Sequence, residues 1–313
     1  MSNGILEKHG GVIKNLALWS TKAVFDAIDT LSDGMLNSCP YNNLTDGIYI
    51  DRDIVYELNK PQVCLFDRYF TPEKSGTPAV IIIHGGGFSS GDKRHRRGLA
   101  RFFASEGYSV FCVNFSLMGK CCFPEPIGEL VRAVNHIGDN ADLYGIDENK
   151  IYITGDSSGA YYAAMLGAFM CDSGINELVG EKLRYPVAGL ILNCGIYDLE
   201  TALNNKVGFI TGGIIDGFFN DYSGRCMPTD FIDGNFPPTF LVFSERDVFC
   251  KGQGEAMQKK LLDCGVYTES YKARHAYSNH CFCLFWRGED ASAANELMRS
   301  FVRRLSCGKI NVD

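Results

Sequence analysis

The chain has 313 residues, of which 46% are hydrophobic, 21% charged and 12% aromatic, and its formal net charge is −7. High hydrophobic content with a modest net charge excludes disorder as the main state. The acidic balance argues against broad binding to nucleic acid or to anionic membranes. No segment reaches the roughly 18 uninterrupted apolar residues of a membrane span. We therefore expect neither a nucleic-acid partner nor stable membrane insertion.

The 13 cysteines are scattered along the chain, and no CxxC pair occurs. The apolar stretch at residues 12–31 is interrupted by four charged side chains, so it does not resemble a signal peptide. Both observations favour reduced thiols in a cytoplasmic protein. The close pairs Cys121–Cys122 and Cys281–Cys283 have the wrong spacing for a zinc site. We predict buried structural cysteines and no metal.

Hydrophobic periodicity predicts an α/β fold. A helix is expected over residues 13–31, and a turn-rich loop over 38–47. Strands are expected at residues 49–54, 63–70, 79–83, 109–115, 151–154, 187–194, 239–243 and 266–271. Helices are expected at residues 98–105, 126–143, 158–170 and 254–262. This alternation indicates a central, mostly parallel sheet flanked by helices. We predict a single domain, 1–313, with small cap elements at 1–45 and 199–238.

The most apolar strand ends in His84, Gly85, Gly86 and Gly87. Three glycines in a row leave backbone N–H groups uncovered, and such groups can stabilise an oxyanion. A phosphate loop is not favoured, because neither GxxxxGK[ST] nor GxGxxG is present. His84 is interpreted as a structural residue that orients the loop. The basic run at 93–97 is interpreted as a solvated face.

Residues 155–159 read GDSSG, a GxSxG pattern between a short strand and a helix rich in small residues. This context predicts a nucleophile elbow with Ser157 at a sharp, strained turn. The flanking glycines let the chain pass close by without a Cβ clash. The following helix directs its amides and its positive dipole end at developing negative charge.

HGGGF at 84–88 and GDSSG at 155–159 together resemble the hormone-sensitive-lipase-like (HGGG / GDSAG) carboxylesterases of the α/β-hydrolase superfamily. The resemblance covers residues 75–285 and includes YGID at 144–147. Ser116 departs from the pattern, because the family has an arginine there. The resemblance implies an α/β-hydrolase fold, and we expect the amides of Gly85, Gly86 and Ser158 to form the oxyanion hole.

In an α/β-hydrolase the acid and the base follow the serine in the order Ser, Asp, His. Asp247 comes after the strand 239–243, so it should lie at the carboxyl end of the sheet. The SERD sequence around Asp247 is similar to the family's acid loop. Glu245 competes with it but is expected to face solvent, and Asp198 is interpreted as a loop anchor.

Only two histidines follow Asp247, namely His275 and His280. Both lie in the loop after the predicted strand 266–271. His280 begins HCF, which is similar to the family's HGF, so we favour His280 as the base. His275 fits the usual loop length nearly as well and remains the alternative until geometry separates the two.

We therefore expect a serine carboxylesterase that acts on small, short-acyl esters through Ser157, His280 and Asp247, with no cofactor. An amidase or arylformamidase with the same triad is one alternative. A non-catalytic receptor is another, because plant gibberellin receptors resemble this family but have lost the catalytic histidine. The retained histidine favours an enzyme. The sequence leaves the physiological substrate and the oligomeric state open.

Overall fold

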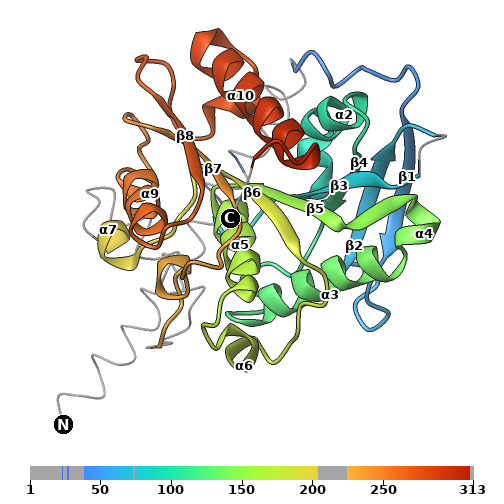
Figure 1. The fold of residues 1–313 in the computed structure, drawn as a ribbon, viewed down its shortest axis with the longest axis horizontal. Helices are drawn as coiled ribbons and strands as arrows, with labels where there is room; N and C mark the ends of the chain where they lie inside the picture. Colours follow the sequence, from blue (N-terminus) through green and yellow to red (C-terminus); the bar gives the residue numbers. More distant parts are fainter. Residues whose placement is uncertain (1–22, 24–26, 28–38, 73–74, 204–223, 311–313) are drawn as a thin grey trace.

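The computed structural model describes residues 23, 27, 39–72, 75–203 and 224–310. The strands within this part form one eight-stranded sheet in the order β1-β2-β4-β3-β5-β6-β7-β8 (Figure 1). The six strands from β4 to β8 in this order run parallel, and β2 pairs antiparallel with both β1 and β4. The strands are β1 (Tyr49–Val55), β2 (Leu65–Phe70), β3 (Thr77–Ile83), β4 (Ser109–Val113), β5 (Ile146–Asp156), β6 (Val187–Asn193), β7 (Thr239–Ser244) and β8 (Thr268–Ala273). The predicted mostly parallel α/β sheet is confirmed.

Each predicted strand has a counterpart in the sheet, whereas the helices differ more from expectation. The described helices are α2 (Arg97–Ser105), α3 (Glu125–Asp139), α4 (Ala141–Tyr144), α5 (Ser158–Gly167), α6 (Ile175–Val179), α7 (Leu199–Leu203), α9 (Gln253–Asp263) and α10 (Gly288–Ser306), with 3₁₀ turns η1 (Lys93–Arg96), η2 (Ala168–Met170), η3 (Pro228–Asp230) and η4 (Phe282–Phe285). The expected helix 126–143 is interrupted at Asn140, whose φ of −106° lies outside helical geometry. Helix α10 was not predicted, because two alanines in its buried stripe weaken the hydrophobic signal.

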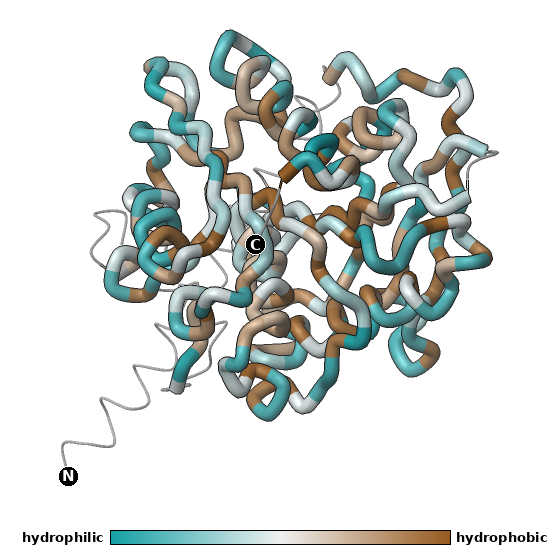
Figure 2. Tube along the Cα trace, in the orientation of Figure 1, coloured by the Kyte–Doolittle hydropathy of each residue, from teal (hydrophilic) through white to brown (hydrophobic). Residues whose placement is uncertain are grey.

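Helices cover both faces of the sheet. Helices α2 and α10 pack on one face, and α3 and α5 pack on the other (Figure 1). Successive strand side chains point to opposite faces. Ile81 and Ile83 therefore belong to the core under α3 and α5, whereas Val80 and Ile82 belong to the core under α2 and α10. Hydrophobic residues concentrate in these central strands (Figure 2). Burial on both faces explains the continuous apolar run of β3.

Much of the predicted cap lies outside the described residues. The helix expected at 13–31 is described only at Ala23 and Ala27, and the insertion 199–238 is not described between 204 and 223. Residues 39–47 consist of turns, as the loop prediction required. The cap elements 1–45 and 199–238, and the single-domain organisation of 1–313, remain predictions. Among the helices of the described part, none is long and apolar enough to cross a membrane.

Candidate active site

The chemistry-bearing residues meet at one edge of the sheet. Ser157 follows β5, Asp247 follows β7, and His280 lies in the loop after β8. The pairings Ile83 with Gly155 and Asp156 with Asn193 place the carboxyl ends of β3, β5 and β6 side by side. Parallel pairing continues through β7 to β8. This edge is where an open parallel sheet holds its ligands.

Ser157 occupies a sharp turn between β5 and α5. Its φ of 52° and ψ of −122° are sparsely populated for a residue with a side chain, so the backbone is strained. The Ser157 amide donates to the carbonyl of Asn193 at 2.8 Å. A Cβ on Gly155 would lie 2.2 Å from the carbonyl oxygen of Gly159, and a Cβ on Gly159 would lie 2.2 Å from that of Ile83. The elbow therefore requires glycine at both positions.

His280 and Asp247 are in direct contact. The Nδ1 atom of His280 lies 2.9 and 3.0 Å from the two Asp247 carboxylate oxygens. That carboxylate also accepts the amides of Phe249 at 2.9 Å and Cys250 at 2.8 Å. Burial raises the pKa of Asp247. The positive charge of His280 and these hydrogen bonds together lower it by a larger amount, so the net pKa lies below its usual value. Burial lowers the pKa of His280, but Asp247 outweighs burial and the net pKa is raised.

The competing candidates have other partners. His275 Nδ1 lies 2.9 Å from the Asp290 carboxylate, and the His275 side chain is 47% exposed compared with 16% for His280. Glu245 is exposed, as expected. Asp198 accepts the Thr201 amide at 2.8 Å, which agrees with its interpretation as a loop anchor. The geometry thus distinguishes His280 from His275, which sequence reasoning left open.

The glycine loop after β3 lies against the elbow. A Cβ on Gly85 would lie 2.5 Å from the Asp156 carbonyl oxygen and 3.1 Å from Ser157 Cβ. Gly86 has a φ of 136°, a conformation that favours glycine. His84 is buried and stacks on Phe115, with ring centroids 4.7 Å apart. Burial lowers the pKa of His84 to about 4, so the ring is neutral near pH 7. His84 is thus a buried part of the glycine loop, which agrees with its interpretation as a structural residue.

Ser158 is the first residue of α5. The first amides of a helix lack partners within the helix and carry the positive end of its dipole. The three amides expected to bind an oxyanion, those of Gly85, Gly86 and Ser158, therefore belong to two segments that meet at Ser157.

Sequence reasoning missed a buried arginine behind the elbow. Arg96 Nε and Nη2 each donate to a different carboxylate oxygen of Asp156 at 2.6 Å. Both residues are buried. Lys93 is also buried, and its Nζ donates to Asp53 at 2.8 Å and to Asp67. The interpretation of 93–97 as a solvated face is therefore wrong for these two residues. One signal in the sequence could have revealed this pair. Asp156 lies between the two elbow glycines, and a carboxylate that is buried there needs a counter-charge.

A cavity of about 520 Å³ borders the glycine loop at the carboxyl ends of β3 and β4. A volume of this size is typical of small-molecule sites. Its lining mixes polar and apolar residues: Gln62, Val63, His84, Ser89, Gly91, Asp92, Asn114, Phe115, Leu117, Met118, Gly119 and Lys120.

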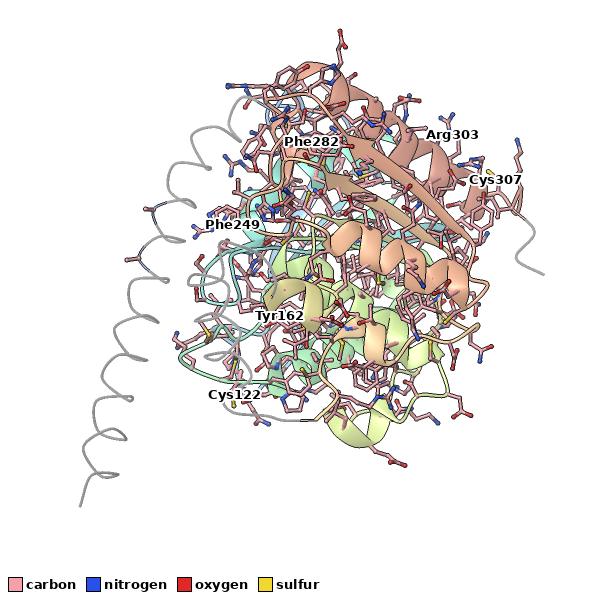
Figure 3. The ribbon with its side chains drawn as sticks, turned by 90° about the vertical axis from the view of Figure 1, so that its left-hand side faces the viewer. Cys122, Tyr162, Phe249, Phe282, Arg303 and Cys307 are labelled. Atoms are coloured by element: carbon pink, nitrogen blue, oxygen red, sulfur yellow. The ribbon has the colours of Figure 1, made fainter. Side chains whose placement is uncertain are left out.

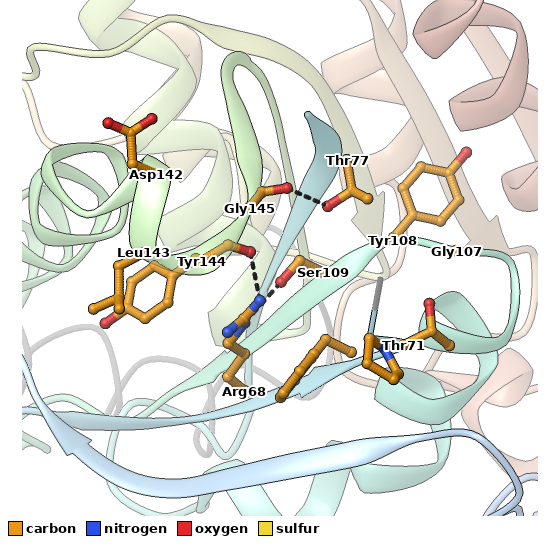
Figure 4. A pocket seen from close by; sticks show the side chains of 12 residues that line it. Arg68, Thr71, Thr77, Gly107, Tyr108, Ser109, Asp142, Leu143, Tyr144 and Gly145 are labelled. Atoms are coloured by element: carbon orange, nitrogen blue, oxygen red, sulfur yellow. Dashed lines mark hydrogen bonds between the residues drawn. The ribbon is translucent and has the colours of Figure 1, made fainter. Parts of the chain in front are cut away.

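A smaller hollow of about 270 Å³ lies around Arg68, at the opposite ends of the strands from Ser157 (Figure 4). Arg68 donates to Ser109 Oγ at 3.0 Å and to the Tyr144 carbonyl. Thr77 and Ser109 begin β3 and β4, so this hollow is on the amino-terminal side, away from Ser157. We therefore place the candidate active site at the carboxyl edge.

Known proteins share this fold and parts of this sequence. An alpha/beta hydrolase of Acanthamoeba polyphaga mimivirus is 28% identical over 62% of this chain and 58% of its own length. Esterase LipQ of Mycobacterium tuberculosis is 27% identical over 64% of this chain and 50% of its own length. The matched region thus spans 58% of the first relative and half of the second. The crystal structure of esterase B from Lactobacillus rhamnosis (HN001) superposes with a TM-score of 0.85 at 18% identity, covering 95% of this chain and 98% of that one.

A family model matches a similar share of the chain. The BD-FAE family model matches residues 66–261, which include the glycine loop, the elbow and Asp247. The match covers more than half of the chain, and the superposition establishes the overall fold. The chain belongs to the BD-FAE family and has the α/β-hydrolase fold.

Proposed function

We propose that the protein is a serine carboxylesterase with Ser157, His280 and Asp247 as its catalytic triad. Ser157 Oγ attacks the ester carbonyl, and His280 accepts the serine proton and then donates it to the leaving alcohol. Asp247 keeps the proton on Nδ1, so that Nε2 is the basic nitrogen, and it stabilises the imidazolium. The observation that carries the proposal is the contact between His280 Nδ1 and both Asp247 oxygens, at the same sheet edge as a strained Ser157.

The oxyanion hole of this proposal consists of the amides of Gly85, Gly86 and Ser158. The tight approach of the glycine loop to the elbow supports it, because a Cβ at Gly85 would contact Ser157. Donors fixed before the reaction begins stabilise the tetrahedral intermediate without reorganisation. Water then hydrolyses the acyl-enzyme by the same proton transfers in reverse. None of these steps uses a metal or a cofactor.

The proposed substrates are small esters with short acyl chains. The 520 Å³ cavity is lined by His84 of the glycine loop but by none of the candidate triad residues, and its volume and mixed lining suit a compact, partly polar molecule. Esterase B, whose fold this chain shares, has also been solved with a C4-C4 SN3 tributyrin phosphonate inhibitor.

All 13 cysteines are free thiols, which supports a reducing, cytoplasmic location for the reaction.

Replacement of Ser157 tests the proposal. Ser157→Ala should lower kcat for p-nitrophenyl butyrate by about 10⁶-fold, because the nucleophile acts as a unit with its base. Ser105→Ala, at an exposed position in α2, is the matched control and should retain wild-type activity. A fluorophosphonate probe should label the control but not Ser157→Ala. An active Ser157→Ala enzyme would contradict the nucleophile assignment, and a wild-type chain that neither hydrolyses esters nor reacts with the probe would support the receptor alternative.

The amidase alternative uses the same triad, so it requires a substrate comparison. An ester and an anilide with the same butyryl group should differ in kcat/KM by a large factor in favour of the ester. Comparable kcat/KM values for the two substrates would favour an amidase that uses the same triad.

A further inference from the structure

The candidate triad is surrounded by thiols. Cys194 follows β6, Cys250 follows Asp247 by three residues, and Cys281 directly follows His280. Ligand atoms of Cys194, Cys281 and His280 all lie within 4.8 Å of one another. A second, overlapping group comprises Asp247, Cys250 and His280 at the same limit. We call Cys194, Cys281 and His280 the thiol–imidazole cluster.

Both thiols of the cluster belong to the buried core under α2 and α10, and their backbones are strained there. Cys194 and Cys281 have positive φ values of 48° and 51°, so each thiol is held by an unfavourable backbone conformation. The Cys194 thiol interacts with Cys281 and with the Asp247 carboxylate. Besides their core contacts, the two thiols lie beside an imidazole and a carboxylate, so four side chains offer donor atoms at one place.

The geometry fits a thiophilic divalent cation. Three atoms within 4.8 Å of one another all lie within 2.8 Å of a common point, which is 4.8 Å divided by √3. Zinc binds thiolate sulfur at about 2.3 Å and imidazole nitrogen at about 2.0 to 2.1 Å. Inward shifts of well under 1 Å per ligand would therefore close the site. Sulfur and imidazole ligands also select Zn²⁺ or Cd²⁺ over Mg²⁺ or Ca²⁺.

We propose that Cys194, Cys281 and His280 form an inhibitory binding site for Zn²⁺ or a cation of similar softness. On binding, both thiols release their protons to solvent and the imidazole gives a nitrogen lone pair to the metal. If Nδ1 binds, its proton moves to Nε2, the contact with Asp247 is lost, and Nε2 can no longer accept the serine proton. If Nε2 binds, His280 cannot accept the serine proton. Either way the base is removed, so the bound enzyme is inactive until the metal leaves.

His280 is the most exposed member of the thiol–imidazole cluster. The His280 side chain is 16% exposed, whereas Cys194 and Cys281 are 2% and 7% exposed. The imidazole is therefore the first ligand that a cation meets. The third donor group among the described residues, Glu57 with Cys64 and Glu129, already has a cation, since Lys60 Nζ lies 2.6 Å from Glu129.

Zinc titration of esterase activity in the full-length chain tests the inhibition. Wild type should be inhibited reversibly, with full recovery after EDTA. Cys194→Ala and Cys281→Ala should each raise the inhibition constant by at least about 10-fold, because removal of even a supporting group costs a metal site that much. Each variant is compared with its own zinc-free activity. Cys307→Ala is the control, because Cys307 is exposed and lies across the molecule from Phe249, which contacts His280 (Figure 3). The same inhibition constant in all four proteins would overturn the proposal.

Only the inhibition depends on the proposed function, so binding is measured separately. Equilibrium dialysis with Zn²⁺, followed by elemental analysis, should show one more tightly bound ion in wild type and in Ser157→Ala than in Cys194→Ala or Cys281→Ala. Cys194→Ser and Cys281→Ser provide the comparison if an alanine variant does not fold. Equal zinc content in wild type and in the folded cysteine variants would refute the site, whether or not the protein proves to be an esterase.

Discussion

Replacement of Arg96 by methionine removes the group that donates two hydrogen bonds to Asp156, a buried carboxylate at the base of the elbow. Arg96 is 8% exposed and Asp156 is 4% exposed, and two hydrogen bonds of 2.6 Å join them. Methionine keeps much of the side-chain volume but leaves Asp156 with an uncompensated buried charge. Loss of one partner of a buried ion pair costs about 3 to 5 kcal/mol. We expect a loss of this size in the free energy of unfolding of Arg96→Met.

The same substitution should reach the candidate active site. Asp156 precedes Ser157, and its Oδ2 atom lies where a Cβ on Gly85 would meet it at 2.5 Å. An unpaired carboxylate moves toward water, and this movement displaces the elbow relative to the glycine loop. A displacement of about 1 Å can lower the rate by 10²-fold, so kcat/KM should fall by about that factor. Arg96 thus acts as a positioning residue.

Urea unfolding and ester hydrolysis would be measured on matched variants. Arg94→Met is the control, because Arg94 is 69% exposed and its pair with Asp92 lies at the surface. That change should cost no more than about 1 kcal/mol. Arg96→Met combined with Asp156→Asn should recover part of the stability, since no buried charge is left unpaired. Equal stability and equal kcat/KM in Arg96→Met and Arg94→Met would contradict the positioning role of Arg96, as would a double variant less stable than Arg96→Met.

Three further predictions concern the reaction. His280→Ala should abolish ester hydrolysis while His275→Ala changes it modestly, as measured by kcat/KM, and the reverse result would make His275 the base. Because Asp247 raises the pKa of His280 above its ordinary value of 6.5, and the protonated ring cannot accept a proton, wild-type kcat/KM should rise with pH through a midpoint above 6.5. Asp247→Asn should lower kcat by about 10⁴-fold and shift that midpoint to lower pH. An unchanged midpoint would show that Asp247 does not raise the pKa of the group that titrates. Among p-nitrophenyl esters below their micellar concentrations, acetate or butyrate should have the highest kcat/KM, and a maximum at octanoate or longer would contradict the small-pocket proposal.

The sequence alone determined the features that depend on neighbouring residues. Strand β3 was predictable because a strand buried on both faces must be apolar at every position. The Ser157 elbow was predictable because its tight approaches require glycine at 155 and 159. The placement of Asp247 followed from its position directly after a strand, since parallel strands end at one edge of the sheet.

Only the tertiary structure decided which distant groups meet. His275 and His280 lie five residues apart in one loop, and spacing could not tell that the first faces Asp290 and the second Asp247. Arg96 looked like part of a solvated basic run, but the packing of η1 against β3 and β4 buries it against Asp156. Zinc spacing rules likewise found no site, because Cys194 and Cys281 are 87 residues apart in the chain. They approach each other because parallel pairing from β6 to β8 brings the loops after these strands to one edge of the sheet.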